Sequence, residues 1–209
     1  MTMLIGIHAG DSVWLAADKR AVYKEGDEVI SVVSDEIVKL VEWSGGYITG
    51  HGYVDLIDKL KEKISSTNVN STTQILEMTN YLSDELKGLP SSYINQTRWV
   101  ITFCSGTEEV ITPKIGYIEP SSANVNMLSE GSCLVWLNIP TDAMQMLQSE
   151  TKKHIRRVDS FDDFSEVVTH YRSLFQQLFA LGSSLDETVC SNFEFSVVLS
   201  DGTRADSYQ

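Results

Sequence analysis

The spacing of apolar residues divides the chain into blocks of strand pattern and blocks of helix pattern, and the order of these blocks limits the folds available to it. Apolar runs within residues 1–50 are typical of strands, whereas after Gly50 the apolar residues recur every three or four positions, as in helices. Strand patterns return near residue 97, helix patterns near residue 132, and one more strand pattern lies near the C-terminus. Such segregated blocks predict an α+β fold with largely antiparallel sheets, since a parallel sheet would need alternating strands and helices.

The predicted strands are short and separated by turn residues. Gly10 and Asp11 form a turn dipeptide that suits a hairpin between the first two strands, and residues 19–30 form a polar connection to the next pair. Pro113 should lie at an edge or at the end of its strand, because proline cannot donate a ladder hydrogen bond. The tail, residues 203–209, is expected to fray. The predicted strands are residues 3–9, 12–18, 36–42, 46–50, 97–105, 109–117, 123–128 and 193–200.

Four further segments have the spacing of helices. The first begins beside Gly50, the second begins with capping-box spacing at Ser71, and the clearest is capped by Ser160 and Asp163. The third contains Pro140, which would interrupt a helix or divide it into two pieces. The predicted helices are residues 53–64, 71–88, 132–150 and 161–181.

Size and charge limit the domain count and the partners. The chain has 209 residues, of which 42% are hydrophobic, and no linker or repeat divides it, so we expect residues 1–209 to form a single domain. The formal net charge of −13 repels phosphate backbones and anionic lipids, which disfavours nucleic-acid and membrane partners. No apolar run approaches the roughly 20 residues that span a bilayer.

The cysteines and histidines show no metal-site pattern. Cys104, Cys133 and Cys190 are scattered and lack C-x-x-C spacing, which argues against a disulfide framework and a zinc site and fits a cytoplasmic protein. The four histidines also lack metal-site spacing, and the motifs of serine hydrolases and nucleotide-binding proteins are missing. We therefore expect neither a metal nor an organic cofactor.

One candidate nucleophile remains, at the start of the chain. A threonine hydroxyl is a weak nucleophile unless a base accepts its proton, and a free α-amine, with a pKa of about 7.7–8, can serve as that base. Removal of Met1 would make Thr2 the N-terminal residue and unite both groups in it. A threonine at position 2 is nevertheless common and carries little meaning without further residues.

The residues that follow Thr2 strengthen this hypothesis. Thr2, Gly6, Asp11 and the run VWLAADKRA that ends at Ala21 resemble the opening of a proteasome β-subunit at ungapped spacings. The resemblance covers essentially the whole chain in element order, and its specific motifs lie in residues 2–21 and 37–52. It implies the four-layer αββα sandwich of N-terminal-nucleophile hydrolases. It also implies a threonine peptidase that acts on peptides or unfolded proteins, as a homo-oligomer and with an unfoldase as a possible partner.

The resemblance implies roles for individual residues. Thr2 would be the catalytic nucleophile, Asp18 and Lys39 would set the charge around it, and the backbone N–H of Gly50 would bind the oxyanion. The connection between Asp18 and Lys39 is about five residues longer than in the usual β-subunit.

The resemblance extends to residues near the C-terminus. Ser132 matches the serine of a family G-S element, and Asp186 matches the acid of a D-x-x-S element, although Val189 stands where its serine would fall. Either Thr188 or Ser191 could replace that hydroxyl, or it could be absent.

Three residues are expected on the acyl side of the substrate: Ala21, His51 and Tyr53. A closed, polar cavity there would favour an alternative function, hydrolysis of a small amide or acyl-amino compound. A third alternative is an inactive structural or binding subunit, which would keep Met1 and thus lack the free amine.

Overall fold

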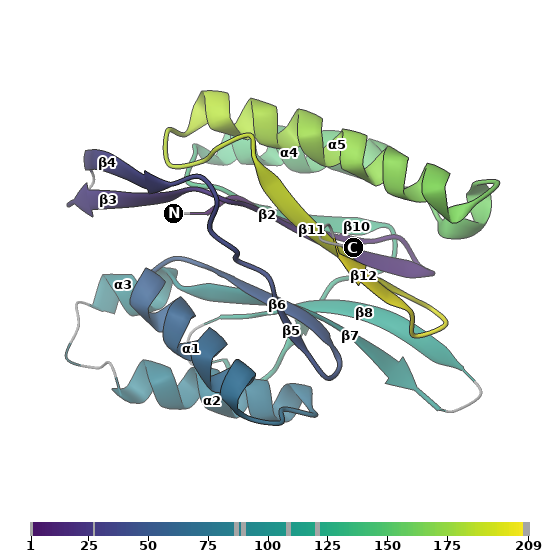
Figure 1. The fold of residues 1–209 in the computed structure, drawn as a ribbon, viewed down its shortest axis with the longest axis horizontal. Coiled ribbons are helices and arrows are strands. Elements are labelled where there is room, and N and C mark those ends of the chain that lie inside the picture. Colours follow the sequence, from purple (N-terminus) through teal and green to yellow (C-terminus); the bar gives the residue numbers. More distant parts are fainter. Residues whose placement is uncertain are drawn as a thin grey trace.

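Two five-stranded antiparallel sheets face each other, and helices cover the outer face of each (Figure 1). The computed structural model describes residues 2–26, 28–85, 88, 91–107, 110–119 and 122–206, without the side chains of residues 91–93. The two sheets and their helices form four layers in the order αββα. The predicted α+β sandwich is therefore confirmed.

The first sheet carries the N-terminal strand and has the order β10-β1-β2-β11-β12. The predicted hairpin between its first two strands is present, with Gly10 at φ +97° in the turn, a conformation that glycine adopts without steric cost. Leu4 of β1 lies opposite Ala17 of β2 on one side and Trp136 of β10 on the other. The strands are β1 (Leu4–His8), β2 (Ser12–Asp18), β10 (Ser132–Trp136), β11 (Phe193–Leu199) and β12 (Arg204–Asp206).

The second sheet has the order β5-β6-β7-β8-β9. Pro113 pairs with Cys104 of β7, whereas β9 pairs with β8 only at Gly116 and Tyr117, so the proline lies where β8 is an edge, as predicted. The strands are β5 (Val41–Trp43), β6 (Gly46–His51), β7 (Arg98–Gly106), β8 (Ile111–Ile118) and β9 (Asn126–Met127).

The helices pack their apolar faces against the sheets. On the first sheet, Tyr171 of α5 stacks on Trp14 of β2 with ring centroids 4.2 Å apart, and Asp163 caps α5 by accepting from the Glu166 N–H. Among the described residues, no helix has the length and apolarity needed to cross a membrane. The helices are α1 (Val54–Ser66), α2 (Thr72–Glu85), α3 (Ser91–Gln96), α4 (Thr141–Lys153), the 3-10 turn η1 (Val158–Ser160) and α5 (Phe164–Leu185).

Three buried apolar clusters correspond to the layers. One lies between α4, α5 and the first sheet, one between α1, α2 and the second sheet, and a third joins the two sheets. The third cluster includes Leu15, Val100 and Ile115, from one strand of the first sheet and two of the second. The two sheets meet where β1 and β2 of the first lie against β8 of the second, and β2 also contacts β7.

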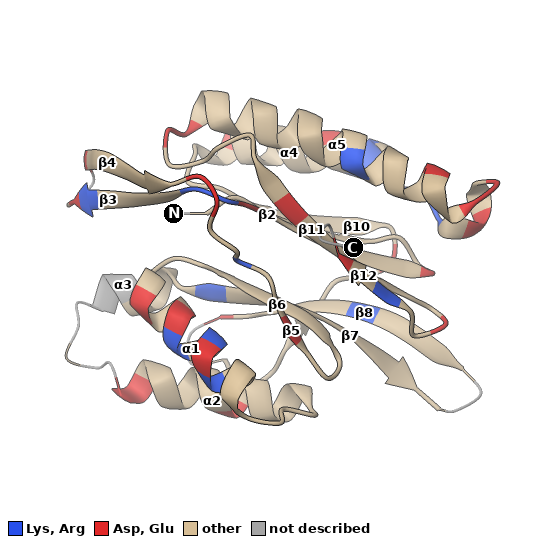
Figure 2. Cartoon of the chain, viewed as in Figure 1, with Lys and Arg blue, Asp and Glu red and all other residues tan. Residues whose placement is uncertain are grey.

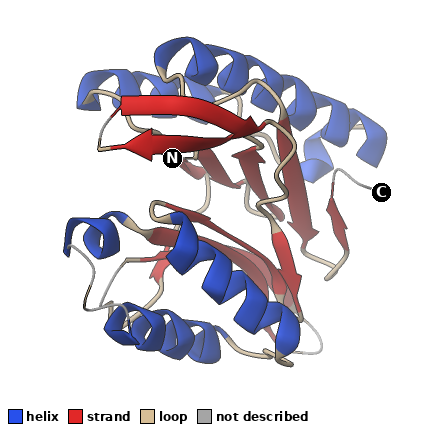
Figure 3. Ribbon diagram, turned by 60° about the vertical axis from the view of Figure 1, so that its left-hand side comes forward, coloured by secondary structure: helices blue, strands red, loops and turns tan. Residues whose placement is uncertain are grey.

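The expected polar connection after β2 is wrong in part, because it forms a hairpin of β3 (Ala21–Glu25) and β4 (Glu28–Ser34). Figure 3 shows this hairpin beside the N-terminus. Most of its side chains are exposed, so the alternation of buried and exposed residues on which the prediction relied is missing. The strand predicted over 36–42 is correspondingly short, since regular pairing begins only at Val41.

The helix predicted over 132–150 is also wrong in nearly its first half, because residues 132–136 form β10 and α4 begins only at Thr141. A short buried apolar run is compatible with either a strand or a helix, and only its pairing with β1 decides between them. Helix α4 begins directly after Pro140, as expected of a residue that cannot continue a helix.

Two shorter C-terminal predictions need correction. Regular structure within 123–128 is limited to Asn126 and Met127 of β9. The expected fraying of 203–209 is wrong for Arg204–Asp206, which pair with β11 as β12, whereas residues 207–209 lie outside the described part.

Candidate active site

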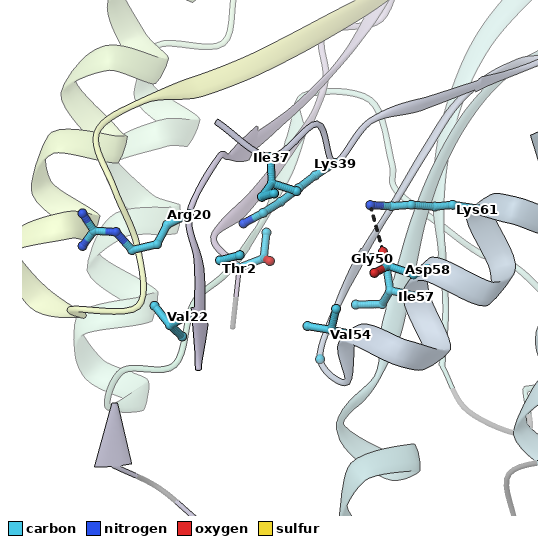
Figure 4. A pocket seen from close by; sticks show the side chains of 12 residues that line it. Thr2, Arg20, Val22, Ile37, Lys39, Gly50, Val54, Ile57, Asp58 and Lys61 are labelled. Atoms are coloured by element: carbon cyan, nitrogen blue, oxygen red, sulfur yellow. Dashed lines mark ion pairs between the residues drawn. The ribbon is translucent and has the colours of Figure 1, made fainter. Parts of the chain in front are cut away.

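Thr2 lies directly before β1 and is buried, with 8% of its surface exposed. Its carbonyl oxygen accepts a hydrogen bond from Nδ1 of His51, the last residue of β6, at 2.5 Å. Thr2 lines a cavity of about 130 Å³ together with Lys39 and Gly50 (Figure 4). Three of the four principal candidate residues thus share one cavity.

The fourth, Asp18, lies at the end of β2 and connects the others. Its Oδ1 accepts from the backbone N–H of Met3 at 2.8 Å and from Nζ of Lys39 at 3.0 Å, and its Oδ2 accepts from the backbone N–H of Arg20 at 2.9 Å. The carboxylate is fully buried. Asp18 therefore holds the backbone next to Thr2 and the Lys39 ammonium at the same time.

Burial opposes ionisation of both members of this pair. Desolvation raises the pKa of Asp18 above its usual value. The Lys39 ammonium and the two backbone N–H donors lower that pKa, but desolvation has the larger effect. Desolvation also lowers the pKa of Lys39, and the adjacent Asp18 carboxylate raises it. Each charge is therefore maintained by the other, and loss of either would leave a buried charge without its counter-ion.

Glu194 on β11 fixes the segment that carries Lys39. Its Oε1 accepts from the backbone N–H groups of Lys39 and Leu40, the latter at 2.8 Å, and the residue is 1% exposed. Sequence reasoning missed this role. The available signal was an acid at the second position of a largely apolar strand, FEFSVVL.

Gly50 lies on β6 where α1 packs against the sheet. A Cβ at this position would lie 2.8 Å from Cγ1 of Ile57, closer than such atoms approach in proteins. The glycine thus permits α1 to sit against β6, and α1 contributes Ile57, Asp58 and Lys61 to the cavity wall.

His51 lies between this cavity and a second hollow. Desolvation lowers the pKa of His51 to about 4, so the imidazole is neutral at physiological pH and its Nδ1 donates to the Thr2 carbonyl. The ring also borders a groove of about 530 Å³ that includes Arg98, Trp136 and Asn138. Residues 50–52 therefore border two hollows, the cavity beside Thr2 and the groove beside Trp136.

The residues predicted on the acyl side separate in the structure. Ala21 lines the cavity that Thr2 also lines, whereas His51 lines the second groove. Tyr53 lines neither, since its ring packs against the cluster under α1 and α2 and its hydroxyl donates to Asp55. The expectation for Tyr53 is therefore not met in this structure.

Ser132 is not brought to Thr2. It pairs with His8, at the opposite end of β1, and its hydroxyl donates to the Ser129 carbonyl. Because Leu4 pairs with Trp136 in an antiparallel register, the residues after Trp136 continue towards Thr2. The match of two residues, Gly131 and Ser132, to the family motif could not reveal this register.

Asp186 ends α5 and accepts from the N–H and hydroxyl of Thr188 at 2.8 and 2.7 Å. It does not line the cavity. The same loop reaches the site through Cys190, whose Sγ lies 4.0 Å from Oδ2 of Asp18, a contact the sequence did not indicate.

Comparison with known proteins finds similarity in structure only. No protein-family model matches the chain, and no curated protein sequence matches it. A solved structure of an Anbu (Gly-1) mutant from Hyphomicrobium sp. strain MC1 superposes with a TM-score of 0.62 at 12% identity, covering 99% of this chain and 87% of Anbu. Eukaryotic HslV from Trypanosoma brucei superposes with a TM-score of 0.54 at 14% identity, covering 94% and 99% respectively. At these identities the similarity establishes a shared fold.

Proposed function

We propose that this chain, which has the fold of proteasome-like N-terminal-nucleophile hydrolases, is a peptidase that uses Thr2 as its nucleophile after removal of Met1. The observation that carries the proposal is the buried Asp18–Lys39 ion pair, which is bonded to the backbone next to Thr2 and lies beside a cavity that Thr2 and Gly50 also line. A buried ion pair at a cavity wall is expensive to maintain, and such pairs are enriched at catalytic sites.

In the proposed reaction, Thr2 Oγ1 attacks the carbonyl carbon of a peptide bond while its own α-amine accepts the hydroxyl proton. The backbone N–H of Gly50 stabilises the oxyanion, and the Lys39 ammonium disfavours a second positive charge on the amine. The leaving amine departs with the proton, which leaves an ester on Thr2. Water then attacks the ester carbonyl, releases the acid and restores the free hydroxyl.

His51 has a positioning role in this proposal. A neutral imidazole that donates to the Thr2 carbonyl fixes the backbone of the nucleophile from the side opposite Asp18, which binds the N–H of Met3. Together these bonds hold the main chain on both sides of the Thr2–Met3 peptide, so that few conformations of the nucleophile remain.

The surroundings favour a peptide over a small metabolite. Val22, Ile37, Val54 and Ile57 give the cavity an apolar wall, and the groove beyond His51 offers space for the chain on the leaving side. We further propose a cytoplasmic homo-oligomer, possible delivery of unfolded protein by an unfoldase, and no cofactor.

Intact mass spectrometry before and after exposure to a β-lactone tests the proposal. We expect a mass without Met1 and one covalent adduct, which is lost in Thr2→Ala and kept in Thr73→Ala, a change of an exposed threonine on α2. A chain that retains Met1 and forms no adduct would refute the proposal and support an inactive subunit. An adduct without cleavage of any peptide would instead favour a small-amide hydrolase.

A further inference from the structure

Among the cations of the described cavity wall beside Thr2, Lys61 makes the longest ion pair, since Lys39 and Arg20 each lie closer to a carboxylate. It projects from α1, its side chain is only 16% exposed, and Figure 4 shows it extending towards Lys39 and Ile37. Its nearest carboxylate, Asp58 one helical turn earlier, has Oδ1 at 3.7 Å from Nζ, beyond hydrogen-bond distance. The ammonium is thus largely removed from water, and desolvation lowers the pKa of Lys61 by more than the Asp58 and Glu194 carboxylates raise it.

The other cations of the described cavity wall are already satisfied. Lys39 donates to Asp18 at 3.0 Å. Arg20 donates to both carboxylate oxygens of Asp35 at 2.7 and 2.9 Å, and its guanidinium points away from the cavity in Figure 4. An incoming anion would therefore interact chiefly with Lys61.

Asp58 does not cancel this positive charge. Its side chain is 57% exposed, so water screens the carboxylate, whereas the Lys61 side chain is only 16% exposed and its field extends into the cavity with less screening. Figure 2 shows acidic and basic residues close together along α1, but burial separates the members of this pair. Desolvation lowers the pKa of Lys61, and a bound carboxylate would raise it again.

The size and wall of the cavity fit one side chain of medium length. Its volume of about 130 Å³ is close to the ~150 Å³ of a cavity known to hold benzene. Val54 and Ile57 would contact the methylene groups of such a side chain, with its end at Lys61. A leucine there would desolvate the ammonium further and add no carboxylate to the distant Asp58, and a lysine would meet a like charge.

We infer that this cavity selects an acidic side chain, glutamate above all, on the acyl side of the scissile bond, with Lys61 as its counter-ion. The inference rests on the proposed function, because it assigns the substrate class of that same site. It makes Lys61 a determinant of specificity with no part in the chemical step.

The test compares kcat/KM for matched fluorogenic peptides with Glu, Gln, Leu or Lys before the scissile bond. We expect the wild-type chain to prefer Glu over Gln by roughly ten- to a hundredfold, the range for a hydrogen bond between charged groups. Lys61→Met should abolish the preference for Glu and improve cleavage after Leu. Lys61→Arg should keep the preference for Glu. Lys59→Met, which removes an exposed lysine of the same helix, is the matched control and should leave the order unchanged.

A binding measurement separates failure of this inference from failure of the proposed function. Titration calorimetry on the Thr2→Ala variant would use the acyl-side products as ligands, which are peptides that end in Glu or in Gln. The peptide that ends in Glu should bind more tightly, and this difference should be lost in the double variant Thr2→Ala, Lys61→Met. If Thr2 forms the β-lactone adduct but the enzyme prefers Leu peptides, the inference is overturned and the proposed peptidase function stands. The same conclusion follows if the enzyme prefers Glu peptides and Lys61→Met leaves that preference intact. Without an adduct the peptidase fails, and equal binding of the two products overturns the inference as well.

Discussion

Replacement of Lys39 by methionine isolates the electrostatic feature on which the site depends. Methionine preserves most of the side-chain volume but leaves the fully buried Asp18 without a cation, beside the N–H groups of Met3 and Arg20 and the thiol of Cys190. Removing one member of a buried pair costs about 3–5 kcal/mol. For a domain of this size that is a fall in Tm of roughly 6–20 °C.

The cost should depend on pH in a defined direction. Without Lys39 the pKa of Asp18 rises further above its ordinary value of 3.8, since desolvation is no longer opposed by the cation. An acid whose pKa is raised in the folded state keeps its full stability below the unfolded pKa and loses it as pH rises through the folded pKa. The deficit of Lys39→Met relative to wild type should therefore be larger near pH 8 than near pH 5.

Urea unfolding of both chains at the two pH values measures this difference. Lys19→Met is the matched control, because its salt bridge with Glu36 involves a carboxylate that is 70% exposed and should contribute about 0–1 kcal/mol. Adding Asp18→Asn to Lys39→Met should recover part of the loss. Equal deficits for Lys39→Met and Lys19→Met, or a deficit independent of pH, would refute the argument.

Two further predictions concern β6. Because the pKa of His51 is lowered from 6.5 to about 4, the unfolded chain binds a proton that the folded chain does not, so stability should fall by about 3 kcal/mol as pH drops through that window. His51→Asn, which cannot titrate, should flatten this slope in urea unfolding; an unchanged slope would contradict the assignment. Gly50→Ala should cost about 1–3 kcal/mol because its Cβ would overlap Ile57, and calorimetric melting should show a smaller cost in an Ile57→Ala background. Equal costs in both backgrounds would rule out this overlap as the cause.

Local sequence patterns predicted the elements whose residues interact with near neighbours. The β1–β2 hairpin depends on a two-residue turn, and α5 on a cap at Asp163 and an apolar stripe, so a few adjacent residues contain the information. The same patterns failed for the β3–β4 hairpin, whose strands bury little, and for β10, whose apolar run is ambiguous until it pairs with β1.

The candidate site divides in the same way. Thr2 directly precedes the β1–β2 hairpin and Asp18 ends it, and the resemblance carried by residues 2–21 had already proposed both for the site. Ser132 could not be assigned by a short match, because the register of β10 against β1 places it beside His8. The role of Glu194 was not predicted because its carboxylate accepts a hydrogen bond from the backbone N–H of Lys39, which lies 155 residues away in the sequence.

The sequence by itself therefore determined the order of the strand and helix blocks, apart from β3, β4, β10 and β12, and the residue types present near the N-terminus. These properties follow from side-chain period and residue type, which are local. The tertiary structure decided which residues meet: Asp18 with Lys39, His51 with the Thr2 carbonyl, and Lys61 with the cavity. Those contacts depend on strand register and on the packing of two sheets, which are set by burial summed over the whole chain.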